Sequence, residues 1–141
     1  MTVPFSYLLI DDNPEDRLLA EEAFEQLCPA CTLTCVGSGR EAIALLRTEG
    51  FEPDVVLLDV NMPGMDGFET LQRLKSDDRL SRIPVVMLTT SQASQDIHRA
   101  YSLFASSYLV KATCFDEFLR QLEAFLTYWK ASRVARQQPE A

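Results

Sequence analysis

The sequence predicts an α/β domain in which a parallel, doubly wound sheet carries helices on both faces. Short apolar runs alternate five times with amphipathic segments, and this alternation is typical of parallel sheets because each crossover between parallel strands needs a helix. The 141 residues, 47% of them hydrophobic and 24% charged, are enough for one globular domain with its own core. We expect residues 5–133 to form this domain and residues 134–141 to form a polar tail.

The first two strand–helix units begin with apolar runs at residues 7–10 and 31–36. Asn13 supplies a side chain that can cap the first helix, and Pro14 suits the first helical position because proline has no N–H to leave unbonded there. Residues 38–41, Ser-Gly-Arg-Glu, form a capping box that predicts the start of the second helix.

The third unit starts from the run at residues 55–58, which is apolar throughout and therefore suits a strand that is covered on both faces. Residues 66–69, Asp-Gly-Phe-Glu, cap the helix that follows. The fourth and fifth strands are expected at residues 84–88 and 107–110, and residues 113–116 cap the final helix. The helical spacing of large apolar residues marks the fourth helix at Ile97, Tyr101 and Phe104.

Four cysteines, Cys28, Cys31, Cys35 and Cys114, permit two interpretations. The first three could bind a metal, since Cys28 and Cys31 have the C-x-x-C spacing and Cys35 follows closely. A structural zinc site normally needs four ligands, however, and no histidine lies near these three cysteines in the sequence. We therefore expect Cys31 and Cys35 to be small core residues of the second strand.

The charge balance excludes two classes of partner. Thirteen Lys and Arg against twenty-one Asp and Glu leave a net charge of −8, which repels phosphate backbones and anionic lipids. We therefore expect binding to neither nucleic acid nor a membrane, and no apolar stretch approaches the roughly 18 residues of a transmembrane helix. The run at residues 7–10 is too short for a signal peptide and acidic residues follow it at once, which favours a cytoplasmic protein.

Chemically active side chains follow four of the predicted strands. Asp11 and Asp12 end the first strand, and Asp59, Thr89 and Lys111 end the third, fourth and fifth. Ligands of open α/β sheets bind beyond the carboxyl ends of the strands, so we expect these side chains to meet at one edge. Clustered carboxylates repel one another unless a hard cation lies between them, and a few carboxylates with water suit Mg²⁺.

This set of side chains predicts phosphoryl transfer. A Mg²⁺ ion and a lysine beside a carboxylate form an electrostatic clamp for a phosphoryl group, and an aspartate can itself be the nucleophile. Asp59 is best placed for that role, because it ends the most apolar strand and precedes the tight loop at residues 61–67.

These residues and the stretch Leu-Leu-Asp-Val-Asn-Met-Pro-Gly-Met-Asp-Gly at residues 57–67 resemble the receiver domain of two-component response regulators. The resemblance covers residues 5–130 and implies a flavodoxin-like sheet with strand order 2-1-3-4-5. The stretch Asp-Asp-Asn-Pro-Glu-Asp-Arg at residues 11–17 and the long, aromatic-ended final helix are most similar to single-domain regulators paired with bacterial phytochrome histidine kinases.

The resemblance implies a role for each residue at this edge. Asp59 accepts a phosphoryl group from a sensor histidine kinase, for which the narrower match suggests a bacteriophytochrome. Asp12 and Asp59 ligate Mg²⁺ through their carboxylates, Asn61 through its backbone carbonyl and Asp11 through a water molecule. Lys111 pairs with the phosphoryl group once it is attached.

The resemblance also implies how the signal leaves the domain. Thr89 hydrogen-bonds a phosphoryl oxygen, and Tyr108 swings between outward and inward rotamers as Thr89 moves. This remodels the face made by the fourth helix, the fifth strand and the fifth helix. The sequence departs from the family at Ala112, where a cis proline usually follows the lysine. We expect a trans Lys111–Ala112 peptide, since a cis bond before a non-proline residue costs about 3–4 kcal/mol.

Two other function classes are compatible with parts of the sequence. Aspartate-nucleophile phosphatases of the haloacid-dehalogenase type also use Asp, Thr, Lys and Mg²⁺, but place a second acid where this chain has Asn61. A receiver-like module that binds partners without phosphorylation would not need Thr89 and Lys111. About ten residues follow the last helix, so we expect no output domain, no enzymatic activity beyond self-catalysed phosphotransfer and dephosphorylation, and an unknown downstream protein.

The end of the final helix predicts an interface. Residues 115–129 make a helix of about 22 Å, whereas a five-residue strand is about 17 Å long. Tyr128 and Trp129 are therefore expected to lie beyond the sheet, exposed for a partner, since aromatic residues are enriched in interfaces. Related phytochrome-linked regulators associate through this side of the domain, so we predict a homodimer, with a kinase contact near the first helix.

Overall fold

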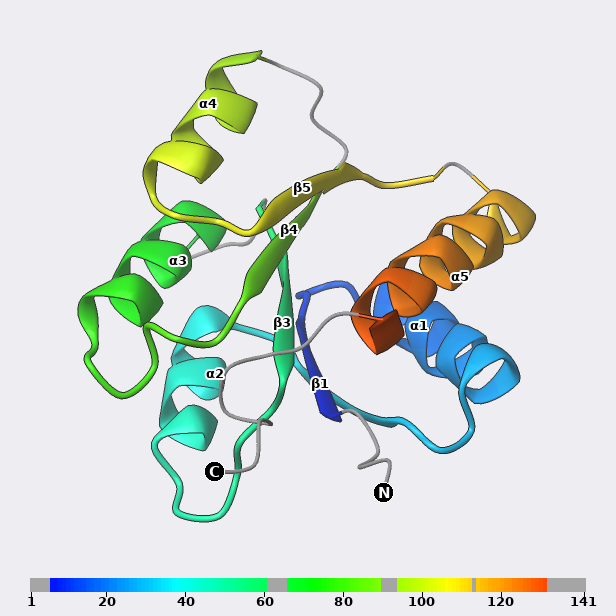
Figure 1. The fold of residues 1–141 in the computed structure, drawn as a ribbon, viewed down its shortest axis with the longest axis horizontal. Helices are drawn as coiled ribbons and strands as arrows, with labels where there is room; N and C mark the ends of the chain where they lie inside the picture. Colours follow the sequence, from blue (N-terminus) through cyan, green and yellow to red (C-terminus); the bar gives the residue numbers. More distant parts are fainter. Residues whose placement is uncertain (1–5, 61–65, 90–93, 113, 132–141) are drawn as a thin grey trace.

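Each of the five apolar runs forms a strand. The computed structural model describes residues 6–60, 66–89, 94–112 and 114–131, and its strands form one parallel sheet in the predicted order 2-1-3-4-5 (Figure 1). The strands are β1 (Ser6–Ile10), β2 (Thr32–Val36), β3 (Val55–Asp59), β4 (Val85–Thr89) and β5 (Ser107–Val110). Every residue of β3 and β4 is buried, whereas β2 and β5, at the two edges, are mostly half-buried. The fold-class prediction is confirmed.

Helices cover both faces of the sheet. They are α1 (Pro14–Leu27), α2 (Gly39–Leu46), α3 (Gly67–Ser76), α4 (Ser94–Ser102) and α5 (Phe115–Ala131). Helices α2, α3 and α4 lie on one face, and α1 and α5 lie side by side on the other (Figure 1). The buried side chains accordingly form two clusters, one on each face of the sheet. Among the described residues, no helix is long and apolar enough to cross a lipid bilayer.

Three helices begin at the caps that the sequence predicts. The side chains of Asn13, Ser38 and Asp66 each accept a hydrogen bond from a backbone N–H of the first helical turn, at 2.8–3.1 Å. Pro14 occupies the first position of α1. The expected cap at Thr113 lies outside the described residues. These caps set the points at which the chain leaves the edge where the strands end.

The fourth helix is shorter than its apolar spacing predicts. Helix α4 stops at Ser102, and Phe104, expected to be helical, has a left-handed backbone with φ of 68°. The N–H of Phe104 donates to the carbonyl of Tyr101 at 3.0 Å. The N–H of Ala105 donates to the carbonyl of Ala100, also at 3.0 Å, which completes a Schellman motif. The motif ends the helix and leaves Phe104 74% exposed.

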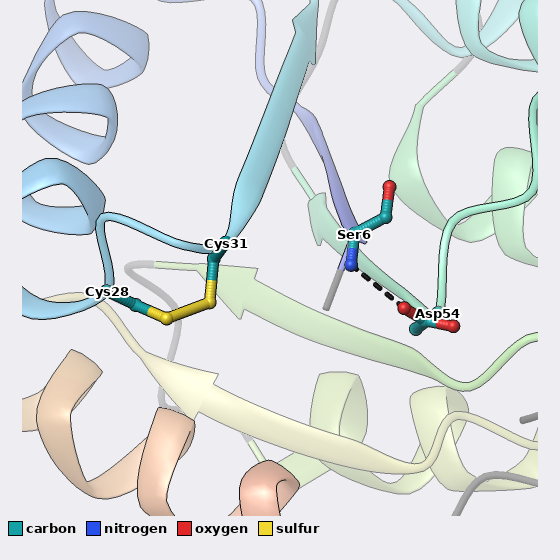
Figure 2. The surroundings of a disulfide bond; sticks show 4 residues. All are labelled: Ser6, Cys28, Cys31 and Asp54. Atoms are coloured by element: carbon teal, nitrogen blue, oxygen red, sulfur yellow. Dashed lines mark hydrogen bonds between the residues drawn. A yellow bond between two sulfur atoms is a disulfide. The ribbon is translucent and has the colours of Figure 1, made fainter. Parts of the chain in front are cut away.

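The turn between α1 and β2 contains a disulfide that the sequence did not predict. Cys31 was expected in the strand, but β2 begins at Thr32, and Cys31 is bonded to Cys28 (Figure 2). The N–H of Cys31 donates to the carbonyl of Cys28, and this turn brings their Cα atoms to 5.3 Å, a distance that a disulfide spans. A metal site that uses both thiolates is incompatible with this bond. Cys35 packs in β2 as expected, and both Cys35 and Cys114 are free cysteines.

The two aromatic residues at the end of α5 differ in burial. Tyr128 is 63% exposed, as predicted, but Trp129 is only 7% exposed, so its predicted exposure is wrong. The Trp129 ring lies 6.2 Å from the ring of Phe125 and belongs to the core cluster that contains Phe24 of α1. The sheet is not the only cover for this ring, because α1 lies beside α5 on the same face (Figure 1).

Candidate functional site

The carboxyl ends of four strands bring the predicted side chains to one edge of the sheet. Asp59 and Thr89 are the last residues of β3 and β4, and Asp11 and Lys111 directly follow β1 and β5. The strands are parallel and in register, with Asp59 opposite Leu88, so these ends lie next to one another. The sequence-based expectation that these residues share one edge is therefore met.

Three carboxylates form a compact acidic cluster at this edge. One oxygen from each of Asp11, Asp12 and Asp59 lies within 4.8 Å of the other two. Asp11 and Asp59 are only 1% and 5% exposed, while Asp12 is the most accessible of the three. Buried carboxylates so close together repel one another, and a divalent cation with oxygen ligands relieves that repulsion. The cluster therefore fits a divalent metal ion, with Asp11 and Asp59 as buried ligands and Asp12 accessible to solvent.

Lys111 is the cation of the site, and three carboxylates surround it. Its Nζ lies 3.0 Å from Asp11 Oδ2, 3.0 Å from Asp16 Oδ2 and 3.6 Å from Asp59 Oδ1. Burial disfavours the ammonium, but the charges of Asp11 and Asp59 and the hydrogen bonds to Asp16 and Asp11 outweigh it and raise the pKa of Lys111. The lysine therefore keeps its positive charge beside Asp59 throughout the neutral range.

Asp16 is the residue of this site that sequence reasoning missed. The sequence indicates only that Asp16 is an acid in the first turn of the first helix, where negative charge interacts favourably with the helix dipole. The signal that could have found it is the short connection between β1 and α1, which keeps that first turn at the same edge as Lys111.

The backbone around Asp11 is held on several sides. Its carboxylate accepts a hydrogen bond from the N–H of Asn13 at 2.9 Å, and its carbonyl accepts one from Arg17 Nη1 at 2.7 Å. Its own N–H donates to the carbonyl of Val36 at 3.1 Å. These bonds tie the loop after β1 to α1 and β2, so the orientation of Asp11 is set before any ligand arrives.

Gly67 allows α3 to start directly against the end of β3. A Cβ at this position would lie 2.3 Å from the carbonyl oxygen of Asp59 and 2.6 Å from Cα of Val60, closer than real contacts allow. The N–H of Gly67 also donates to the carbonyl of Val60 at 2.9 Å. The glycine therefore fixes the backbone that carries Asp59.

The remaining predicted site residues are placed as follows. Thr89 is fully buried at the end of β4, and Tyr108, opposite Met87, is half-buried against the core beneath α2, α3 and α4. The Lys111–Ala112 peptide is trans, as expected. Asn61, the predicted carbonyl ligand, lies outside the described residues. Of the predicted site, the described residues thus bring together Asp11, Asp12, Asp59 and Lys111, with Thr89 on the neighbouring strand end.

Two proteins with similar sequences are named as regulatory proteins. The chain is 40% identical over 130 residues to the probable methanogenesis regulatory protein FilR2 of Methanothrix harundinacea. The matched region covers 89% of this chain and 84% of that protein. The chain is 32% identical over 131 residues to the response regulator Rcp1 of Synechocystis sp., which covers 89% of each chain. Both likenesses extend over most of both proteins.

Solved structures agree with these relatives. The phosphorylated cyanobacterial phytochrome response regulator RcpA superposes with a TM-score of 0.87 at 32% identity, over 94% of this chain and 99% of that one. The Mn²⁺-bound form of Rcp1 superposes with a TM-score of 0.84 at 30% identity, over 93% and 99%. Residues 7–123 also match the family described as the response regulator receiver domain. With its strand order, its acidic cluster and its lysine, this chain belongs to the family of response regulator receiver domains.

Proposed function

We propose that Asp59 accepts a phosphoryl group from a sensor histidine kinase in a Mg²⁺-dependent reaction. The observation that carries this proposal is that Asp59 belongs to the acidic cluster and also lies 3.6 Å from the ammonium of Lys111. A bound Mg²⁺ would supply positive charge to the oxygens of the phosphoryl group. RcpA is described as phosphorylated and Rcp1 as Mn²⁺-bound, which supports the same chemistry in this chain.

Asp59, Lys111 and Thr89 have separate roles in the transfer. A carboxylate oxygen of Asp59 bonds to phosphorus while the bond from phosphorus to the kinase histidine nitrogen breaks, and that nitrogen keeps the electron pair. The ammonium of Lys111 pairs with a phosphoryl oxygen, and the buried hydroxyl of Thr89 donates a hydrogen bond to another. The product is an acyl phosphate on Asp59.

The signal then passes to the face of α4, β5 and α5. Thr89 on β4 and Tyr108 on β5 come from adjacent strands, and Tyr108 is half-buried, so its ring joins the core to the surface next to Thr89. This half-burial supports a switch in which the Tyr108 ring reports the state of Asp59 to that face.

Two sets of exposed apolar side chains support protein partners. Tyr101, Phe104 and Tyr128 are exposed on α4, the turn that follows it and α5, and they support a homodimer through the α4-β5-α5 side. Leu18 and Leu19 are exposed on α1, next to the edge that carries Asp59, and they support a kinase contact there. The names of two solved relatives, the cyanobacterial phytochrome response regulator RcpA and the bacteriophytochrome response regulator AtBRR, support a bacteriophytochrome as that kinase.

A phosphodonor assay tests the function directly. The protein is incubated with acetyl phosphate and Mg²⁺, and its intact mass is measured. We expect a gain of one phosphoryl group, its loss on treatment with hydroxylamine, and no gain when a chelator removes the metal, since the carboxylates alone would repel the donor.

Variants locate the acceptor. Asp59→Asn should remove the mass gain completely. Asp54→Asn is the matched control, because Asp54 is also buried next to β3 but accepts a hydrogen bond from the Ser6 N–H at the far end of the sheet (Figure 2). Full phosphorylation of the Asp59→Asn protein would contradict the proposal, and no phosphorylation of the wild-type protein would favour the phosphorylation-independent interaction module. Membership of the receiver family already favours a phosphoacceptor over an aspartate-nucleophile phosphatase.

A further inference from the structure

The contact between Asp16 and Lys111 joins α1 to the end of β5 across the site. Asp16 Oδ2 lies 3.0 Å from Lys111 Nζ, closer than Asp59 Oδ1 at 3.6 Å. The two residues are 95 positions apart in the chain, so the contact exists only in the folded domain. The ammonium is therefore held mainly by Asp16 and Asp11, and the phosphoacceptor is its third and most distant carboxylate partner.

The two close partners of Lys111 differ in one respect. Asp11 belongs to the acidic cluster and shares its charge with any cation bound there, whereas Asp16 lies outside that cluster. Asp16 is also in the first turn of α1, where the helix dipole attracts negative charge. When a divalent cation binds, Asp16 is therefore the partner whose attraction for Lys111 is least reduced.

Without Asp16 the side chain of Lys111 would have space to leave its position. A cavity of about 180 Å³ lies between α1 and α5, and Lys111, Asp16 and Leu19 are among the residues that line it. The residue after Lys111 is Ala112, so no proline ring restricts the backbone that follows. An unrestrained lysine side chain samples many rotamers. An ion pair with its ammonium therefore determines which of these rotamers it occupies.

We propose that Asp16 is a positioning residue that keeps the Lys111 ammonium beside Asp59 when the acidic cluster holds its metal ion. This inference rests on the proposed phosphoryl transfer and adds a residue to it. Asp16 is not a member of the acidic cluster, and it acts through its ion pair with Lys111.

Kinetics of phosphorylation test this role. At saturating Mg²⁺ and acetyl phosphate, Asp16→Asn should lower the maximal rate about fivefold, the scale expected for a partly exposed ion pair. Glu15→Gln is the matched control, since it removes the same charge from the same helical turn at an exposed position, and it should leave the rate unchanged. Asp16→Glu should recover part of the rate. In a Lys111→Ala background, Asp16→Asn should cause no further loss, because the two residues act as one unit.

A second measurement examines the contact without phosphorylation. Acetic anhydride labelling followed by peptide mass analysis should modify Lys111 several-fold faster in the Asp16→Asn protein than in the wild type or in Glu15→Gln. Equal labelling in all three proteins, equal rates for Asp16→Asn and Glu15→Gln, or a further loss in the Lys111→Ala background would overturn the inference. If the wild type is not phosphorylated at all, the proposed function fails, and the labelling result still decides whether Asp16 positions the lysine.

Discussion

At the scale of single residues, the site depends on groups that are fixed before a ligand arrives. Asp11 has its carboxylate, carbonyl and N–H bonded to Asn13, Arg17 and Val36, and its second carboxylate oxygen contacts Lys111. A buried carboxylate with this many partners keeps one orientation. The cost of reorganising the site during phosphoryl transfer is correspondingly small.

Gly67→Ala tests how tightly the backbone of Asp59 is held. The new methyl group would overlap the Asp59 carbonyl, and backbone atoms cannot move aside as a side-chain end can. We expect a loss of about 1–3 kcal/mol in the free energy of unfolding, measured by denaturant titration. Gly37→Ala is the control, because its Cβ meets only the end of the Arg17 side chain at 3.2 Å. Equal losses in the two variants would contradict the close approach.

The two free cysteines should differ in reactivity. Burial, reinforced by the nearby Glu21, raises the pKa of Cys35 to about 12, whereas Cys114 is exposed. Because a raised pKa favours the neutral thiol, Cys35 carries very little thiolate at pH 8. Iodoacetamide at pH 8, without reductant, should modify Cys114 and spare Cys35 in peptide mass maps. Faster modification of Cys35 would contradict its placement in β2.

At the scale of elements, the residues at the ends of the helices determine where the chain turns. Side-chain caps start α1, α2 and α3, and they follow rules that a sequence displays openly. The end of α4 lacks the residue that usually signals a helix end in a sequence. A Schellman motif normally has glycine at the left-handed position, and here it has Phe104.

Phe104→Gly should therefore stabilise the domain. The exposed ring contributes little burial, and glycine removes the cost of a side chain in the left-handed region, about 1 kcal/mol. Gly50→Ala is the reciprocal control: Gly50 has φ of 91° with nothing within 4 Å, so the substitution should destabilise by a similar amount. Thermal melting of both variants measures the difference. A destabilised Phe104→Gly protein would mean that its ring is bound to a partner surface, for instance in a dimer.

At the scale of the whole molecule, the two faces of the sheet separate the proposed partner surfaces. Helices α1 and α5 share one face and α2, α3 and α4 the other, so the exposed residues of α1 and those of the α4–β5 turn lie on different sides (Figure 1). A kinase at Leu18 and Leu19 of α1 and a second copy at Tyr101 and Phe104 therefore use different faces, and variants of the two sets test them independently.

Light scattering at micromolar concentration tests the homodimer. Tyr128→Ser should weaken association while changing the free energy of unfolding by less than about 1 kcal/mol, because the ring is mostly exposed. Leu18→Ser, an exposed change on α1, should leave association intact. Trp129 is unsuitable for this purpose, since removing its buried ring should cost about 3–5 kcal/mol. A wild-type protein that stays monomeric with and without phosphorylation would refute the dimer.

The sequence by itself determined the sheet, its helices and most of the site. Apolar runs that alternate with capped amphipathic segments specify a parallel sheet, and the residues after such strands must then meet at one edge. Asp11, Asp59, Thr89 and Lys111 could be found in this way because their positions depend only on where strands end.

Only the tertiary structure decided how segments distant in the chain cover or contact one another. The contact of Asp16 with Lys111 and the burial of Trp129 depend on how α1 and α5 pack, and the left-handed Phe104 depends on how α4 meets β5. Local periodicity reports which face of an element is apolar, but not which neighbour will cover its last turn or which of several acids will lie nearest a lysine. Those outcomes follow from packing between helices that are adjacent in space and far apart in sequence.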